Sequence, residues 1–155
     1  MGNANRGKLT RKGAEGKVQY KSNNGYCEFD ISGKIIGCAI DVFKELGYGH
    51  REKVYQNALS LAMEETGLKY QREKYGKIKY RDQIVGKYFL DFLVEGCVAV
   101  ELKIRAEEYN KDLCQLLDYM VSENIKIGLL LKITKQGIKP KRLINSKRNI
   151  LRNSA

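Results

Sequence analysis

Two apolar segments, residues 88–94 and 98–104, are separated by the three residues Glu95-Gly96-Cys97. Segments of this length and composition predict two antiparallel strands of one β-hairpin. A two-residue loop would pair residue 94 with residue 97, whereas a three-residue loop pairs residue 94 with residue 98. We adopt the three-residue loop, because hairpin loops of this length with a glycine are common. This register predicts that Asp91 lies opposite Glu101.

The charged residues inside these two strands point to a site. Alternation along residues 98–104 places Glu101 and Lys103 on one face, with the apolar valines and leucine on the other. Asp91 interrupts the other apolar strand, where Asp is a poor strand former and a buried carboxylate is costly. Two acids at close range call for a cation, and their oxygen atoms suit Mg²⁺ or Mn²⁺. A purely structural salt bridge between Lys103 and one acid is the alternative.

The rest of the chain alternates between helical and extended patterns. Apolar residues at helical spacing predict helices over 32–46, with Ser32 as N-cap, over 51–66 and over 109–121. Strands are expected over 68–80 and 84–94, joined by a turn at 81–83, and over 98–104 and 125–133. A last strand or helix is expected after Pro140. The order α-α-β-β-β-α-β predicts one α/β domain, in which helices flank a mixed sheet that contains a hairpin.

Composition limits the chemistry that this chain can perform. It has 155 residues, of which 43% are hydrophobic, enough for one packed domain. His50 is the single histidine and the four cysteines form no CxxC pair, which argues against a His/Cys zinc site and against any Ser-His or Cys-His nucleophile pair that does not use His50. No apolar run reaches the length of a membrane span, and no secretory signal is recognisable. We therefore expect no membrane association and a cytoplasmic location.

The net charge of +11 is concentrated at the ends of the chain. Residues 1–25 hold six Lys or Arg and one acid, and residues 132–155 hold eight Lys or Arg and no acid. Basic ends suit a nucleic-acid partner, although they are also typical of solvated tails. We therefore divide the chain into a flexible basic extension (1–30), a domain (31–145) and a basic tail (146–155).

The middle segment 69–87 is also basic, and tyrosines are interleaved with its lysines and arginines. This pattern is typical of a ribbon that follows a phosphate backbone, and it makes Lys74, Lys77 and Lys79 candidate substrate-binding residues. Polar edge strands have a similar composition, so a purely structural ribbon is the alternative.

The pattern G-x-x-E-x-x-Y is matched by residues 49–55, and D-x9-E-x-K is matched by residues 91–103. With Gln115 and Tyr119 in a later helix, this order resembles the GxxExxY protein family within the PD-(D/E)XK nuclease superfamily. The resemblance extends from Lys34 to Ile144. It implies a restriction-endonuclease-like core and metal-dependent hydrolysis of phosphodiester bonds, in DNA or, less often, RNA.

The resemblance also implies a role for each matching residue. Asp91 and Glu101 match the metal-binding acids, with the carbonyl of Leu102 as a further ligand. Lys103 matches the lysine that orients or activates the attacking water and stabilises the charge that develops on the phosphate. Glu52 matches a helical acid that contacts the metal, directly or through water.

Three further residues complete the implied site. Gln115 matches a glutamine of the catalytic set, and Tyr55 and Tyr119 are candidate substrate-binding residues. The chain departs from the family pattern at Tyr48, where a proline is common, and at Asp118, where an asparagine is common. A nuclease with Mg²⁺ or Mn²⁺, acting on DNA and able to form a homodimer, is the first expectation. The alternative is a catalytically weak or inactive nucleic-acid-binding module of the same fold.

Overall fold

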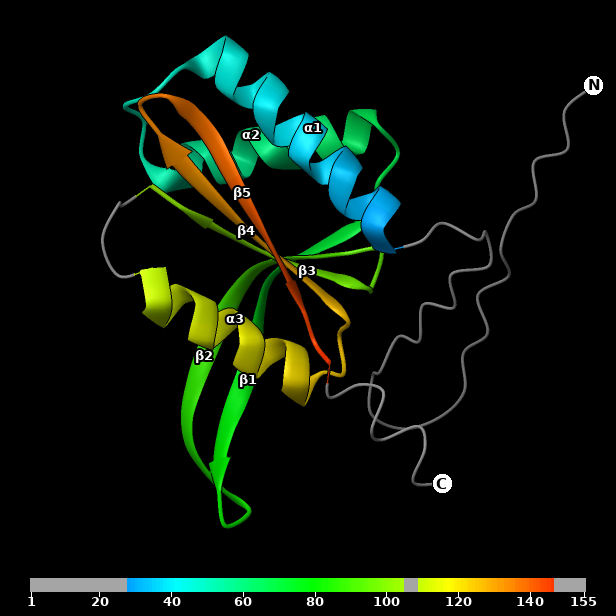
Figure 1. The fold of residues 1–155 in the computed structure, drawn as a ribbon, viewed down its shortest axis with the longest axis vertical. Helices are drawn as coiled ribbons and strands as arrows, with labels where there is room; N and C mark the ends of the chain where they lie inside the picture. The colour runs from blue at the N-terminus through cyan, green and yellow to red at the C-terminus, as the bar shows by residue number, and fades with distance from the viewer. Residues whose placement is uncertain (1–27, 105–108, 147–155) are drawn as a thin grey trace, which may run out of the picture.

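The computed structural model describes residues 28–104 and 109–146, which form helices and strands in the predicted order with one strand more (Figure 1). The elements are α1 (Glu28–Leu46), α2 (Glu52–Glu65), β1 (Tyr70–Tyr80), β2 (Gln83–Val94), β3 (Val98–Lys103), α3 (Tyr109–Ser122), β4 (Ile127–Thr134) and β5 (Gly137–Ile144). Pro140 lies within β5, at the edge of the sheet, where a missing N–H is tolerated. The last element is therefore a strand that contains the proline, rather than one that follows it.

The strands form one mixed sheet in the order β1-β2-β3-β4-β5. Strands β1, β2 and β3 are joined by tight loops and pair antiparallel, as do β4 and β5. Strands β3 and β4 pair parallel, because α3 carries the chain back across the sheet between them. The predicted α/β class with a mixed sheet flanked by helices is confirmed.

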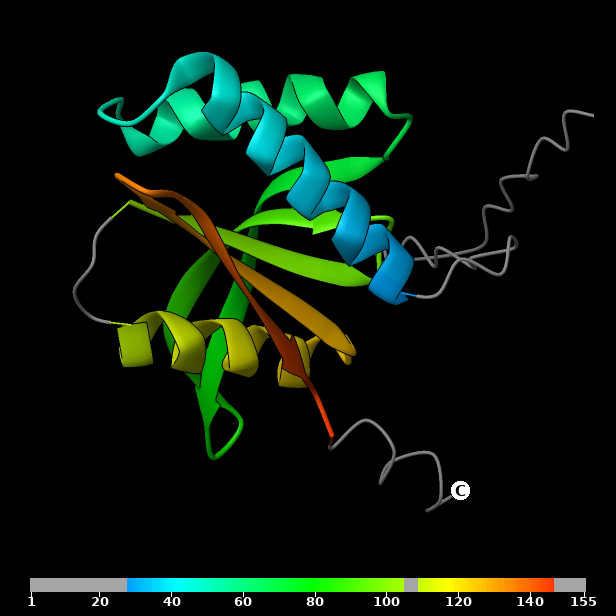
Figure 2. The same ribbon diagram turned by 45° about the horizontal axis from the view of Figure 1, so that its top comes forward.

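Helices cover both faces of the sheet. Figures 1 and 2 show α1 and α2 on one side and α3 on the other. Alternation along β3 places Val98, Val100 and Leu102 in the core beneath α1 and α2, as predicted. Ala99 points the other way, into a smaller core with Leu116 of α3. In the part of the chain that the structure describes, no helix is long and apolar enough to cross a membrane.

Two predicted details at the ends of elements are wrong. Helix α1 begins at Glu28, so Ser32 lies inside the helix instead of at its N-cap. Its Oγ donates to the carbonyl of Phe29 and accepts from Nε of Arg142 in β5, at 2.8 Å each. The β1–β2 loop contains two residues, 81 and 82, both with positive φ, whereas three were predicted. The predicted N-terminal extension and basic tail fall largely outside the described residues, and residues 28–30 of that extension are helical.

Gly76 of β1 leaves room for the ring of Tyr88 on β2, which gives a stability prediction. A Cβ at this position would overlap with the ring of Tyr88, whose hydroxyl lies 2.6 Å from Oγ of Ser122 in α3. We expect Gly76→Ala to lower the free energy of unfolding by about 1–3 kcal/mol, measured by urea denaturation, because the tyrosine must leave its place. Gly86→Ala is the control, since its Cβ would meet Ile78 at 3.4 Å. Equal losses in both variants would contradict this explanation.

Candidate active site

The backbone pairing of β2 with β3 stops where the predicted acids begin. The ladder runs from Val94–Val98 to Phe92–Val100, which confirms the three-residue loop. Glu95 and Gly96 adopt φ values of 50° and 64° in that loop, the left-handed region that such hairpins use. The next positions along the two strands are Asp91 and Glu101, where the backbones no longer pair. We call this place, where β2 and β3 separate, the fork.

At the fork, carboxylates take over hydrogen bonds that a neighbouring strand would otherwise make. The backbone N–H of Asp91 donates to Oε2 of Glu101 (3.3 Å), and the N–H of Leu102 donates to Oδ2 of Asp91 (2.7 Å). Nζ of Lys103 lies 2.8 Å from Oε1 of Glu101. The structure therefore brings together the two acids and the lysine that the sequence predicted to converge.

Burial sets the electrostatics of the fork. Burial and then the charge of Asp91 raise the pKa of Glu101 to about 7. Burial also raises the pKa of Asp91, against the hydrogen bond from Leu102 and the charge of Lys103. Burial alone would lower the pKa of Lys103, but Glu101, Glu52 and Asp91 raise it above its ordinary value. The lysine therefore stays cationic, and the two carboxylates repel each other in a site that is largely shielded from solvent.

Glu52 enters the fork from the first turn of α2. Its side chain is half-buried, and burial raises its pKa, while the charge of Lys103 and a hydrogen bond from the backbone of Ile104 act in the opposite direction. Ile104 directly follows β3, so the start of α2 lies beside the end of that strand. The fourth predicted charge thus lies at the same place as the other three.

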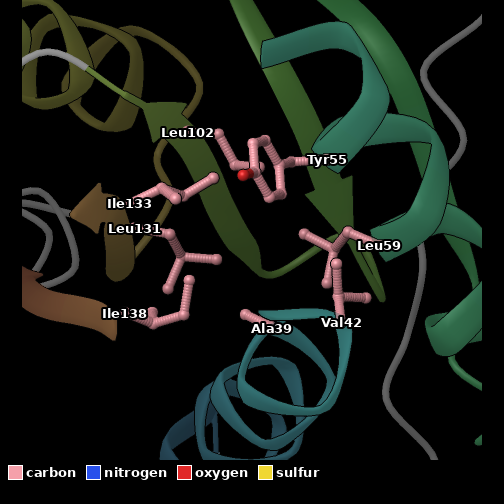
Figure 3. A pocket seen from close by; sticks show the side chains of 8 residues that line it. All are labelled: Ala39, Val42, Tyr55, Leu59, Leu102, Leu131, Ile133 and Ile138. Atoms are coloured by element: carbon pink, nitrogen blue, oxygen red, sulfur yellow. The ribbon is translucent and has the colours of Figure 1, made fainter. Parts of the chain in front are cut away.

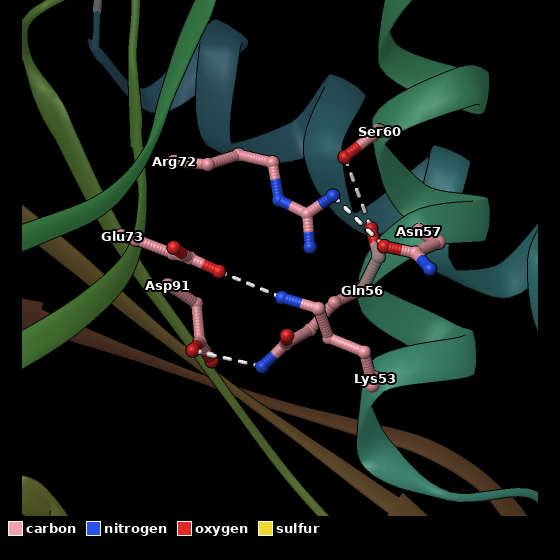
Figure 4. Close-up of polar contacts among 7 residues, drawn as sticks. All are labelled: Lys53, Gln56, Asn57, Ser60, Arg72, Glu73 and Asp91. Carbon is pink, nitrogen blue, oxygen red and sulfur yellow. Dashed lines mark hydrogen bonds and ion pairs between the residues drawn. The ribbon is translucent and has the colours of Figure 1, made fainter.

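One face of α2 holds β1 and β2 through polar contacts (Figure 4). Nε2 of Gln56 donates to Oδ1 of Asp91 (2.9 Å), Lys53 pairs with Glu73 (2.7 Å), and Asn57 accepts from Arg72 (2.9 Å). Sequence reasoning missed Gln56. The signal was its position four residues after Glu52, because residues at i and i+4 share a helix face.

Tyr55 lies in the core below the fork. It is 1% exposed, and its ring lines a small apolar space between the helices and the sheet, together with Leu102 (Figure 3). Its hydroxyl donates to the carbonyl of Gly47 (2.6 Å) and accepts from the backbone N–H of His50 (3.3 Å). The predicted substrate-binding side chain is therefore inaccessible here. It instead fixes the loop that precedes Glu52.

The predicted residues of α3 have different surroundings. Nε2 of Gln115 donates to the carbonyl of Phe89 (3.0 Å), two residues before Asp91 on β2. Tyr119 is 2% exposed and packs edge-on against Tyr88, so it too does not present a substrate-binding surface. It belongs to the same buried cluster as Leu116 and Met120, on the side of α3 that packs against the sheet.

The three predicted lysines lie on the β1–β2 hairpin. Lys77 and Lys79 are exposed, and Lys74 is partly buried. Lys74 opposes Leu90 and Lys77 opposes Lys87, so alternation places Lys74 and Lys77 on opposite faces of the hairpin. The lysines therefore do not form one continuous line along it.

Comparison with known proteins identifies the family. The family model described as the PD-(D/E)XK nuclease superfamily matches residues 29–143, which include the whole fork. The chain belongs to the PD-(D/E)XK nuclease superfamily. No curated protein matches its sequence.

Two solved structures are similar to this PD-(D/E)XK chain at low identity. The crystal structure of SSO0001 is 16% identical, with a TM-score of 0.48 over 66% of this chain and 59% of that chain. The present chain thus spans less than two thirds of the length of that structure. The crystal structure of the alkaline exonuclease LHK-Exo from Laribacter hongkongensis is 12% identical, with a TM-score of 0.45 over 87% of this chain and 77% of that chain.

The donor atoms of this PD-(D/E)XK fork suit a divalent cation. Among residues 28–104 and 109–146, no three Asp, Glu, His or Cys side chains already stand together as a metal cluster. However, the oxygens of Asp91 and Glu101 are oriented by the hydrogen bonds and ion pair described above. Each carboxylate oxygen carries two lone pairs, so one protein donor leaves a position for another partner. Hard oxygen donors with adjacent negative charges fit Mg²⁺ or Mn²⁺.

Proposed function

We propose that the protein is a metal-dependent nuclease that hydrolyses phosphodiester bonds, with DNA as its substrate. The observation that carries this proposal is the convergence of Asp91, Glu101, Lys103 and Glu52 at the fork of a chain from a nuclease superfamily. The basic composition of the chain supports a polyanionic substrate.

The residues of the fork would divide the chemistry between them. Asp91, Glu101 and the carbonyl of Leu102 would hold Mg²⁺ or Mn²⁺, with Glu52 beside them. When bound, such an ion lowers the pKa of water and neutralises charge on the scissile phosphate. Lys103, kept cationic by its acidic neighbours, orients the attacking water and stabilises the additional negative charge of the transition state. Gln56 and Gln115 hold β2 from two helices and act as positioning residues.

Finer assignments follow from the same site. We propose that the chain is a GxxExxY protein, because Glu52 reaches the fork and Tyr55 fixes the loop before it. One fork per chain cuts one strand at a time, so cleavage of both strands in one event would require a homodimer. The competing function is binding of nucleic acid without turnover, which the same fold and charge would also support.

A substrate panel tests the proposed function. Single-stranded, duplex and branched DNA and an RNA are incubated with the protein in Mg²⁺, Mn²⁺ or EDTA. We expect cleavage of a DNA substrate with either ion and none in EDTA. Absence of cleavage on every substrate, together with no effect of either ion on the melting temperature, would overturn the proposal. Salt-dependent binding without cleavage would favour the competing function.

Gln56 provides a prediction about positioning. Without its amide, Oδ1 of Asp91 loses the donor that orients it. We expect Gln56→Leu to raise the Mn²⁺ concentration needed for half-maximal cleavage by about 10-fold, the size of effect that outer partners of metal ligands have. Asn57→Leu is the control. Asn57 lies on the same face of α2, but its side chain contacts Arg72 of β1 and not an acid of the fork. The idea fails if both variants have the same metal requirement as the wild type.

A further inference from the structure

The end of the β1–β2 hairpin projects beyond the rest of the described chain, as Figures 1 and 2 both show. We call residues 74–90 the arm. Strand β3 does not reach it, because the β2–β3 ladder stops at Phe92. One face of the arm packs against α3 through Tyr88 and Leu90. The opposite face has no helix over it in the part of the chain that the structure describes.

That open face carries an exposed aromatic pair. Tyr75 and Phe89 oppose each other across the two strands, with ring centroids 6.4 Å apart. They are 54% and 62% exposed, respectively. Two adjacent aromatic rings that are both exposed to solvent form an apolar patch, and such patches indicate an interaction site.

Two lysines lie beside the aromatic pair on the same face. Lys77 and Lys87 form the next cross-strand pair, and Nζ of Lys87 lies 5.6 Å from the centre of the Tyr75 ring. Across the arm, five Lys or Arg accompany one acid, Asp82. A second copy of this chain would bring the same positive charge against it, whereas a polyanion is attracted. The charge therefore selects nucleic acid over self-association as the occupant.

The form of that nucleic acid follows from the rings. In a duplex, each base is already stacked between its neighbours and its face is inaccessible. Unpaired bases can stack on aromatic side chains, and each such contact contributes strongly and with little sequence preference. Lysines beside the rings suit the phosphates of the same strand. The open face therefore has the chemistry of a platform for single-stranded nucleic acid.

The platform adjoins the fork. Phe89 precedes Asp91 by two residues, a span of about 7 Å along a strand. Its carbonyl accepts from Nε2 of Gln115 in α3, so the backbone that carries the ring is attached to that helix. A strand that stacks on Phe89 would have its next phosphates within reach of the acids.

We infer that Tyr75 and Phe89 form a base-stacking platform that feeds an unpaired strand into the fork, so that the substrate is single-stranded nucleic acid or a single-stranded end. The delivery of a strand to the fork rests on the proposed nuclease function, but binding to the platform can be measured without cleavage. It makes Tyr75 and Phe89 specificity-determining residues.

Binding is measured in EDTA by fluorescence anisotropy, with a short labelled oligothymidylate and a labelled duplex of the same length. We expect the double variant Tyr75→Ser/Phe89→Ser to bind the single strand about 10-fold more weakly and the duplex nearly as the wild type does. The control is Leu61→Ser on α2, where the side chain is 61% exposed and equally apolar. We expect it to change neither affinity.

Three outcomes would overturn the platform. The first is an unchanged affinity of the double variant for the single strand. The second is an equal loss of affinity for both probes. The third is that the wild type sediments as a dimer and the double variant as a monomer. Cleavage of duplex DNA by a protein whose aromatic pair has no effect would remove the platform and leave the proposed function intact. Single-strand binding through the pair, without cleavage of any substrate, would remove the proposed function alone.

Discussion

Replacing Lys103 with methionine is expected to reduce the rate of cleavage at saturating Mn²⁺ by about 100- to 1,000-fold, the effect of removing one preorganised charge from a transition state. Methionine preserves much of the length of the side chain but leaves no cation beside Oε1 of Glu101. Binding of nucleic acid should change little, because one lysine among many contributes little to long-range attraction. Single-turnover rates and anisotropy separate the two effects.

Lys132→Met is the matched control for this experiment. Lys132 is the parallel-ladder partner of Lys103 on β4, so both positions lie on one rung of the sheet. We expect this variant to cleave within about 3-fold of the wild type, since Nζ of Lys103, and not its neighbour on β4, pairs with Oε1 of Glu101. An equal loss of cleavage rate in the two variants would show that the overall positive charge matters and that Lys103 has no specific catalytic role.

Glu101→Gln is expected to abolish cleavage and yet stabilise the metal-free protein. Above pH 7, Glu101 is ionised in a site where burial and Asp91 raise its pKa to about 7. The amide removes that charge but also the ion pair with Lys103, so we expect a net gain of about 1 kcal/mol at pH 8 and a melting temperature higher by roughly 2–5 °C. Thermal unfolding in EDTA measures this gain.

The pH dependence of that gain has a definite sign. A carboxyl with a raised pKa in the folded state holds its proton more tightly there than in the unfolded chain, so stability falls as pH rises from about 4.5 to about 7. The advantage of Glu101→Gln should therefore vanish near pH 5 and be complete at pH 8. Glu45→Gln, at an exposed position of α1, is the control. A lower melting temperature for Glu101→Gln at pH 8 would contradict the account.

The central hairpin could be predicted because its determinants are local. A three-residue loop with a glycine fixes the register, and alternation then fixes which side chains of β3 enter the core. Asp91 and Glu101 meet for this reason alone. Lys103 follows two residues later on the same face. Predicting this part of the candidate site therefore required no knowledge of packing between distant segments.

The errors concern contacts between distant segments. Tyr55 shares a helix face with Glu52 and Tyr119 shares one with Gln115, which predicts that both face the site, but their exposure depends on how each helix lies on the sheet. Gln56 acquires its role from a strand 35 residues away. The lysines of the arm were treated as one line, although strand alternation divides them between faces. The burial of the two tyrosines arises from tertiary packing, whereas the division of the lysines follows from strand alternation and could have been predicted.

The fork also lies where the backbone pairing within the sheet is shortest. Strand β3 pairs with β4 along its whole length, from Val98–Ile127 to Lys103–Lys132, but it pairs with β2 over three rungs. Glu101 and Lys103 therefore belong to one stiff unit with β4, whereas Asp91 belongs to the arm-bearing unit with β1. The site therefore lies at the boundary between the β1–β2 part and the β3–β4–β5 part of the sheet. A change in the angle between these two parts would change the separation of Asp91 and Glu101.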